Sequence, residues 1–114
     1  MLKHKLLVLS NPVDGRSVEY NNWYDDVHLK EVLELDGMTS AERFTLADNG
    51  KWKYLAIYEL DTDDPQHILD TLYRLAAEGE IDVTDALDSQ STFPMIATSM
   101  GVSHTAERLG RAAL

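Results

Sequence analysis

The spacing of apolar residues along this chain changes from a period of two to a period of about 3.6 and back, twice. A period of two indicates a strand, and a period of 3.6 indicates an amphipathic helix. Turn-forming clusters such as Asn11-Pro12 and Asp36-Gly37 separate the segments. The resulting order is strand, helix, strand, strand, helix, strand. We expect strands at residues 3–10, 38–47, 52–61 and 92–102, and helices at about 16–35 and 65–78.

The first helix carries an aromatic stripe. Four of its residues recur at i, i+3, i+4 and i+7, namely Tyr20, Trp23, Tyr24 and Val27. His28 lies one turn beyond Tyr24 and borders this stripe. The apolar residues from Leu29 onward do not continue the same face. We therefore expect a kink or a second short turn near Leu29.

Turn and cap residues define the other connections. Asp48-Asn49-Gly50 lies between two runs of strand-forming residues, and Asn-Gly is a strong signal for a short hairpin. Asp64 and Pro65 predict the start of the second helix, with Asp64 as its cap. The sequence predicts an acidic, irregular segment at 80–91 and a short amphipathic tail helix at 104–113.

The order of these elements predicts an α+β fold of the ferredoxin-like βαββαβ type. In this fold a four-stranded antiparallel sheet carries both helices on one face. A chain of 114 residues has room for one such domain, so we expect residues 1–114 to form a single domain.

Both faces of the predicted strands are apolar. In the third strand Tyr54 and Tyr58 share one face, whereas Leu55 and Ile57 lie on the other. Two helices cover one face of a sheet, and an uncovered apolar face of this size exceeds what monomers usually expose. The pattern predicts a homodimer with sheet packed on sheet. We expect Tyr54, Tyr58 or Met95 to be buried between the subunits.

Composition excludes several function classes. The chain has 20 Asp and Glu residues against 10 Lys and Arg residues, a net charge of −10, and no cysteine. This balance argues against nucleic acid and anionic membrane surfaces as partners, and no apolar run is long enough to span a membrane. A cysteine-free chain has no disulfides or thiolate ligands and suits the reducing cytoplasm. The four histidines form no metal-binding pair and no Gly-rich phosphate loop occurs, so we expect neither metal nor cofactor.

Three segments of the chain resemble the dimeric α/β-barrel superfamily, and its EthD-like branch most closely. They are NPVDGR (residues 11–16), EYNNWYDDVHL (19–29) and EVL (31–33), followed by Gly37. The resemblance is strongest from Ser10 to Leu46. Lys30 stands where such relatives often carry a proline after His-Leu.

This resemblance implies a homodimer that acts on small molecules. Characterised members of the superfamily include cofactor-free monooxygenases, polyketide cyclases, muconolactone isomerases and aldoxime- or nitrile-forming lyases. The namesake of the EthD-like branch accompanies an ether-degrading oxidation system. A shared fold of this kind does not by itself select one reaction.

His28 and Tyr24 are the candidate catalytic residues. Imidazole titrates near neutral pH, so His28 can act as acid or base with little tuning. Tyr24, four residues earlier on the same helix face, can donate a hydrogen bond to the same substrate. Asp25 is a candidate to orient the ring. The alternative is that His28 is a structural residue at the kink.

The candidate substrate-binding residues are Tyr20, Trp23, Glu42 and Phe44. Aromatic residues at helical spacing more often form plain core, so the pocket is one of two interpretations for Tyr20 and Trp23. Glu42 shares a strand face with Phe44, and an inward carboxylate is a candidate base with a raised pKa. The alternative for Glu42 is a solvated or ion-paired side chain.

Two function classes follow. The first is a cofactor-independent enzyme of the cyclase, isomerase, lyase or monooxygenase type, acting on an aromatic or polyketide-like compound with His28 as acid–base. The second is a non-catalytic small-molecule-binding or accessory protein of a degradation or biosynthetic pathway. The sequence offers one clear acid–base candidate and no second one, so it does not choose between them.

Overall fold

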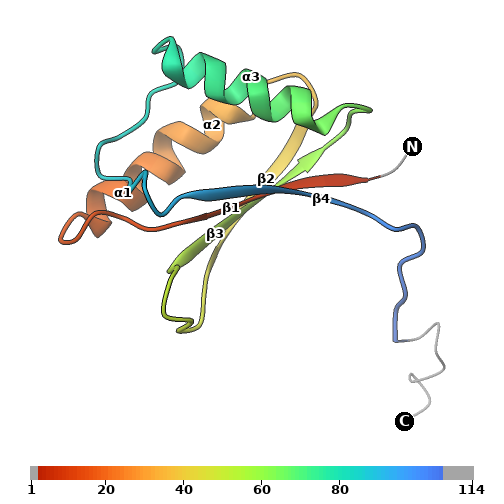
Figure 1. Cartoon of the computed structure of the whole chain (residues 1–114), viewed down its shortest axis with the longest axis horizontal. Helices are drawn as coiled ribbons and strands as arrows, with labels where there is room; N and C mark the ends of the chain where they lie inside the picture. Colours follow the sequence, from red (N-terminus) through yellow and green to blue (C-terminus); the bar gives the residue numbers. More distant parts are fainter. Residues whose placement is uncertain (1–2, 107–114) are drawn as a thin grey trace.

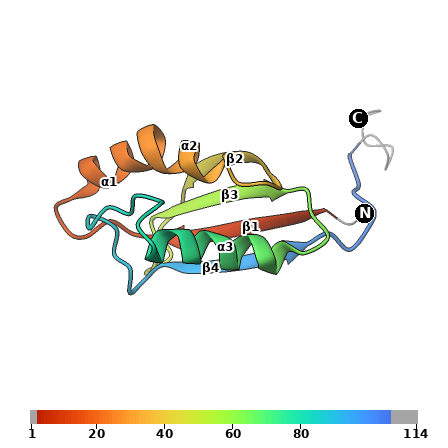
Figure 2. The ribbon, with the colours of Figure 1, turned by 90° about the horizontal axis from the view of Figure 1, so that it is seen from above.

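The structure, a computed structural model, describes residues 3–106 and contains a four-stranded sheet with two helical segments on one face (Figures 1 and 2). Its elements follow the predicted order. They are β1 (His4–Ser10), α1 (Ser17–Trp23), η1 (Tyr24–His28), α2 (Leu29–Val32), β2 (Met38–Thr45), β3 (Tyr54–Leu60), α3 (Pro65–Ala77) and β4 (Phe93–Thr98).

The sheet confirms the predicted fold class. Its strand order is β2-β3-β1-β4, and every neighbouring pair is antiparallel. The register places Leu6 of β1 between Tyr58 of β3 and Ile96 of β4. Because neighbouring residues in register share a face, these three side chains all lie on the side of the sheet that the helices cover.

The core lies between the helices and this face. Leu6, Tyr20, Val32 and Tyr58 are its most deeply buried large side chains. The prediction that Tyr58 lies at a dimer interface is therefore wrong, because Tyr58 is 1% exposed within the single chain. Tyr54 packs against the same core. Which face the helices cover depends on the direction of the chain connections, and the alternation of apolar residues does not contain that information.

A π-helical turn explains why the apolar period slips in the first helix. The backbone runs as α-helix to Trp23, as π-helix from Tyr24 to His28, and as α-helix again from Leu29. A π-turn adds about one residue to a helical turn, so it shifts the positions that face the core. The expected irregularity thus lies in the turn that ends at His28, and the helix continues through it.

The β2–β3 connection is longer than the tight hairpin that Asn49-Gly50 predicts. Residues 46–53 form an eight-residue loop in which the Asn49 side chain accepts hydrogen bonds from the backbone N–H groups of Lys51 and Trp52. Asn49 thereby substitutes for ladder hydrogen bonds and lets the strands end early. Trp52 lies outside β3 and stacks on Phe93.

The helix start at Asp64 is confirmed, and the end of the chain differs from expectation. The Asp64 carboxylate accepts a hydrogen bond from the backbone N–H of His67 at 3.1 Å, with Pro65 at the first helical position. The last strand ends at Thr98, four residues before the predicted end. Residues 104–106 are not helical, and the rest of the predicted tail helix lies outside the described residues.

Gly37, between α2 and β2, provides a test of the packing of α3. Its φ is +92°, and a Cβ atom there would lie 2.6 Å from Cδ1 of Ile68. We expect Gly37→Ala to lower the free energy of unfolding by about 2–4 kcal/mol, because backbone strain and overpacking add. Gly79→Ala is the matched control. Its φ is +77° with no atom near the added Cβ, so we expect a loss of about 1 kcal/mol. If urea unfolding gave the same loss of unfolding free energy for Gly37→Ala and Gly79→Ala, the expected clash with Ile68 would be contradicted.

Candidate functional site

A cavity of about 300 Å³ lies between the helical layer and the sheet. Its lining comes from the first helix, from α3, from the covered faces of β1, β3 and β4, and from the segment between α3 and β4. We call that segment, residues 78–92, the roof loop. Among residues 3–106, no Asp, Glu, Lys or Arg lines the cavity. An uncharged concave site with few polar groups is typical of small-molecule binding.

The π-turn places His28 at this cavity. The imidazole stacks on the indole of Trp23, with ring centroids 4.3 Å apart and planes 23° apart. Tyr24 meets the same imidazole nearly at right angles, at 5.2 Å. All three side chains line the cavity. Two aromatic neighbours thus fix the orientation of the imidazole without a hydrogen bond.

His28 carries an unpartnered polar atom in this largely apolar environment. Among residues 3–106, its Nδ1 is the one buried side-chain nitrogen or oxygen without a hydrogen-bond partner. Burial lowers the pKa of His28 to about 4, because the charged imidazolium loses its hydration. A buried N–H without an acceptor is costly, so we infer that the proton of the neutral ring resides on Nε2. His28 is therefore neutral near pH 7.

Three phenols share the cavity with His28, those of Tyr24, Tyr58 and Tyr73. Burial raises the pKa of Tyr24 and of Tyr73, and it raises the pKa of Tyr58 well above the usual value. The three hydroxyls therefore stay protonated at neutral pH. With the neutral imidazole, they give the cavity polar groups that carry no charge.

Arg43 of β2 packs on the ring of Tyr24 and is outside the lining of the cavity. Its guanidinium carbon lies 4.4 Å from the centroid of the Tyr24 ring. Nη1 donates a hydrogen bond to Asp25 Oδ1 at 2.9 Å, and Nη2 donates one to Asn21 Oδ1 at 2.7 Å. Cation–π contacts of this kind stabilise by about 0.5–2 kcal/mol. Arg43 thus joins strand β2 to the helix that carries His28.

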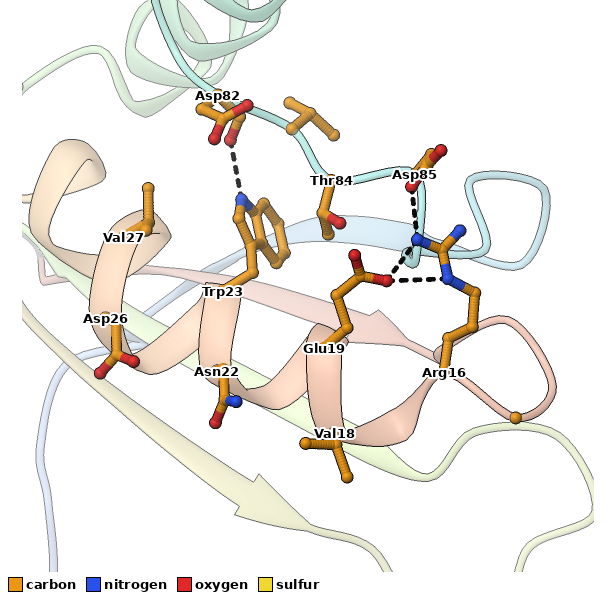
Figure 3. A pocket seen from close by; sticks show the side chains of 12 residues that line it. Arg16, Val18, Glu19, Asn22, Trp23, Asp26, Val27, Asp82, Thr84 and Asp85 are labelled. Atoms are coloured by element: carbon orange, nitrogen blue, oxygen red, sulfur yellow. Dashed lines mark hydrogen bonds and ion pairs between the residues drawn. The ribbon is translucent and has the colours of Figure 1, made fainter.

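Trp23 lines both this cavity and a wider, open cleft on the molecular surface, and Figure 3 shows the residues of that cleft. Its indole Nε1–H donates a hydrogen bond to the backbone carbonyl of Asp82 in the roof loop, at 2.9 Å. Farther along that cleft, Arg16 pairs with both Glu19 and Asp85. These contacts fix the roof loop against the first helix, and Trp23 connects the loop to the imidazole that it stacks on.

The structure brings together three of the six predicted site residues. His28, Tyr24 and Trp23 line the cavity, whereas Tyr20, Glu42 and Phe44 lie outside its lining. The register places Glu42 and Phe44 on the uncovered face of the sheet, and both are exposed.

Two of the individual assignments change for reasons of local bonding. Tyr20 is fully buried, and its hydroxyl hydrogen-bonds to Ser10 Oγ at 2.6 Å, so it belongs to the core. Asp25 does not orient His28, because its carboxylate pairs with Arg43. Arg43 lies within reach only because β2 crosses beneath the first helix.

Several lining residues have no functional signal in the sequence. Tyr58, Leu72, Ile81 and Leu87 line the cavity from three different parts of the chain. From the sequence alone, each of these residues is interpreted as an ordinary core residue. Only the packing of α3 and the roof loop over the sheet brings them together.

Residues 3–106 contain neither a cluster of metal-ligating side chains nor a membrane-spanning helix. Across residues 3–106 no three His, Asp or Glu side chains gather to hold a metal ion. No helix of this part of the chain has the length and apolar character to cross a membrane.

Solved structures share this fold. No protein-family profile and no curated protein matches the sequence. An ethyl tert-butyl ether D (EthD) family protein from Bacillus halodurans superposes with a TM-score of 0.59 at 15% identity, over 88% of this chain and 100% of that one. A protein named "putative monooxygenase" from Shewanella loihica superposes with a TM-score of 0.57 at 15% identity, over 92% of this chain and 99% of that one. A dimeric ferredoxin-like protein of unknown function from Thermobifida fusca gives 0.54 at 10% identity, over 86% and 92%. The chain thus has the fold of the EthD-like, ferredoxin-like proteins.

The burial of His28 predicts a specific pH dependence of stability. The unfolded chain protonates this residue near pH 6.5 and the folded chain only near pH 4, so the unfolded state binds more protons between these values. Stability therefore falls as the pH falls through this window. We expect the free energy of unfolding, measured with urea, to fall between pH 7.5 and pH 5 by about 2 kcal/mol more in the wild type than in His28→Phe. Parallel pH profiles of the two proteins would contradict the buried, neutral imidazole.

Proposed function

We propose that this chain binds an uncharged aromatic or polyketide-like small molecule in the His28 cavity and converts it without a cofactor, with His28 as acid–base. The observation that carries the proposal is an imidazole whose Nδ1 has no hydrogen-bond partner, in a cavity that no charged side chain of residues 3–106 lines. Because His28 lines this cavity, its ring would contact a ligand bound there. A cysteine-free chain also suits our proposal of a cytoplasmic location.

The lining selects against charged ligands. A carboxylate entering this cavity would lose its hydration and meet no cation in return, a cost of several kcal/mol. The net charge of −10 adds a long-range repulsion of anions. Neutral aromatic surfaces, in contrast, can pack against Trp23 and the aliphatic side chains of α3.

The state of His28 sets the order of proton transfer. Since the imidazole is neutral near pH 7, it first accepts a proton from an acidic C–H or O–H group of the substrate and later returns it. Imidazolium formed in this way would be paired with the substrate anion, which offsets the cost of its burial. In this proposal the Tyr24 hydroxyl donates a hydrogen bond to the substrate oxygen that gains charge. The monooxygenase name of the Shewanella loihica protein agrees with small-molecule chemistry on this fold.

The second candidate is a non-catalytic binding or accessory protein with the same ligand class. It is favoured by the environment of Nδ1, which has no carboxylate or carbonyl partner within residues 3–106. In many catalytic sites a third group orients the base through such a bond. The two candidates differ in turnover and agree on the cavity and its ligand.

A matched pair of ligands tests the site. We expect methyl 2-naphthoate to raise the melting temperature and the corresponding carboxylate, 2-naphthoate, to have no effect, because the anion gains no ionic partner in the cavity. Among compounds that bind, acid–base catalysis predicts that His28→Phe lowers turnover by about 10²–10⁴-fold. His67→Ala, at an exposed histidine of α3, is the control and should leave turnover unchanged. Binding without any turnover would favour the second candidate, and stronger binding of the anion would contradict both.

We also propose that the protein is a homodimer formed across the uncovered face of the sheet. This face presents apolar side chains from all four strands, namely Leu7, Leu9, Phe44, Leu55, Ile57, Phe93 and Met95. Phe44, Phe93 and Met95 are 38%, 46% and 36% exposed in the single chain. Such a continuous patch favours an isologous contact with a second copy. The dimeric protein from Thermobifida fusca agrees with this arrangement.

Met95→Glu tests the assembly. We expect light scattering to give twice the chain mass of 12.8 kDa for wild type at micromolar concentration. The variant should scatter as a monomer, because a carboxylate would be buried near the two-fold axis without a partner. Val18→Glu places the same charge on the exposed side of α1 and should remain dimeric. A monomeric wild type would overturn the homodimer.

A further inference from the structure

The chain leaves the sheet abruptly after β4. The backbone N–H of Ser99 donates a hydrogen bond to the carbonyl of Lys3 at 2.7 Å, which extends the pairing of β4 with the start of β1 by one step. The Ser99 hydroxyl then accepts a hydrogen bond from the N–H of Gly101 at 3.1 Å, and Gly101 has a φ of +124°. This left-handed turn redirects the chain. We call residues 99–106 the arm.

The arm carries two exposed apolar side chains. Met100 is 103% exposed and Val102 is 73% exposed. A single exposed apolar residue is ordinary, whereas two in one short segment without helix or strand indicate a surface that is covered in the assembled protein.

The arm also belongs to an uncharged part of an acidic chain. Residues 89–106 contain no Asp, Glu, Lys or Arg, although these types make up 26% of the sequence. Solvated segments usually carry charge, and charged residues are depleted at the centre of protein interfaces. Since the whole chain has a net charge of −10, an uncharged segment is the part that can approach a second copy without repulsion.

The direction of the arm selects its partner. Beyond β4 the chain turns to the side of the sheet opposite the helices (Figure 1). The same side carries the apolar face on which we place the second subunit. Sheets packed face to face lie about 10 Å apart. An extended segment spans about 3.3 Å per residue, so residues 101–106 can reach about 20 Å. The arm is therefore long enough to contact a copy on that face.

We propose that the arm packs against the partner subunit of the homodimer, with Met100 and Val102 as its apolar anchors. This inference rests on the homodimer proposed above and adds a second contact to it. In a two-fold dimer each subunit gives one arm and receives one, so the contact occurs twice. The arm thereby adds buried apolar area outside the sheet-on-sheet interface.

The first experiment measures dimer affinity by sedimentation equilibrium. We expect the double variant Met100→Asp, Val102→Asp to raise the dimer dissociation constant at least tenfold, because each dimer loses four buried apolar side chains. Val18→Asp is the matched control, since Val18 is 76% exposed on α1. Its dimer dissociation constant should equal that of the wild type. The circular dichroism of all three proteins should agree. An unchanged dissociation constant of the arm variant would overturn the proposal.

The second experiment locates the arm. The chain has no cysteine, so Val102→Cys accepts a single environment-sensitive dye. We expect the emission to shift to the blue as the concentration rises through the dissociation constant. A dye that is protected in the dilute monomer would show that the arm packs on its own chain, and a dye still exposed in the dimer would show that it packs on neither; both results overturn the proposal. A monomeric wild type would overturn the proposed homodimer itself. A dimer that Met95→Glu dissociates and the arm variant does not would overturn the arm contact and leave the homodimer in place.

Discussion

The packing of the aromatic side of the first helix on the sheet is the contact on which the rest of the structure depends. Tyr20 reaches Ser10 of β1 through a hydroxyl pair, and Arg43 of β2 lies over the ring of Tyr24. Trp23 connects the same helix to the roof loop through its indole N–H. One helix face thus contacts two strands and the roof loop. Removing this contact would open the cavity as well as the core.

The cost of burying charge explains the chemistry of the cavity. An apolar lining keeps His28 neutral and keeps the phenols of Tyr24 and Tyr58 protonated, since each charged form would lose its hydration. The same lining disfavours charged ligands. Nδ1 of His28 stays without a hydrogen bond because the π-turn directs the ring between Trp23 and Tyr24, where both neighbours are aromatic. Among residues 3–106, the protein thus tolerates one buried, unpartnered side-chain polar atom, and it belongs to a residue that lines the cavity.

The sequence predicted the order of the elements, the cap at Asp64 and the irregular period near His28 because these depend on neighbours along the chain. It also placed His28, Tyr24 and Trp23 along one side of the first helix, and all three line the cavity. It did not show on which side of the sheet Tyr58, Glu42 and Phe44 lie, because alternation tells which residues share a strand face but not which face the helices cover. A strand with two apolar faces has the same sequence pattern whichever face the helices cover.

The sequence by itself determined the fold class, the aromatic stripe and the exclusion of cysteine chemistry, since periodicity and composition are local or additive properties. Only the tertiary structure decided that Arg43 supports Tyr24, that Asp25 pairs with Arg43, and that the roof loop closes the cavity over His28. These contacts join residues 18 or more positions apart. Such contacts depend on the sheet register and on the direction of each crossover, which are set by the packing of the whole chain.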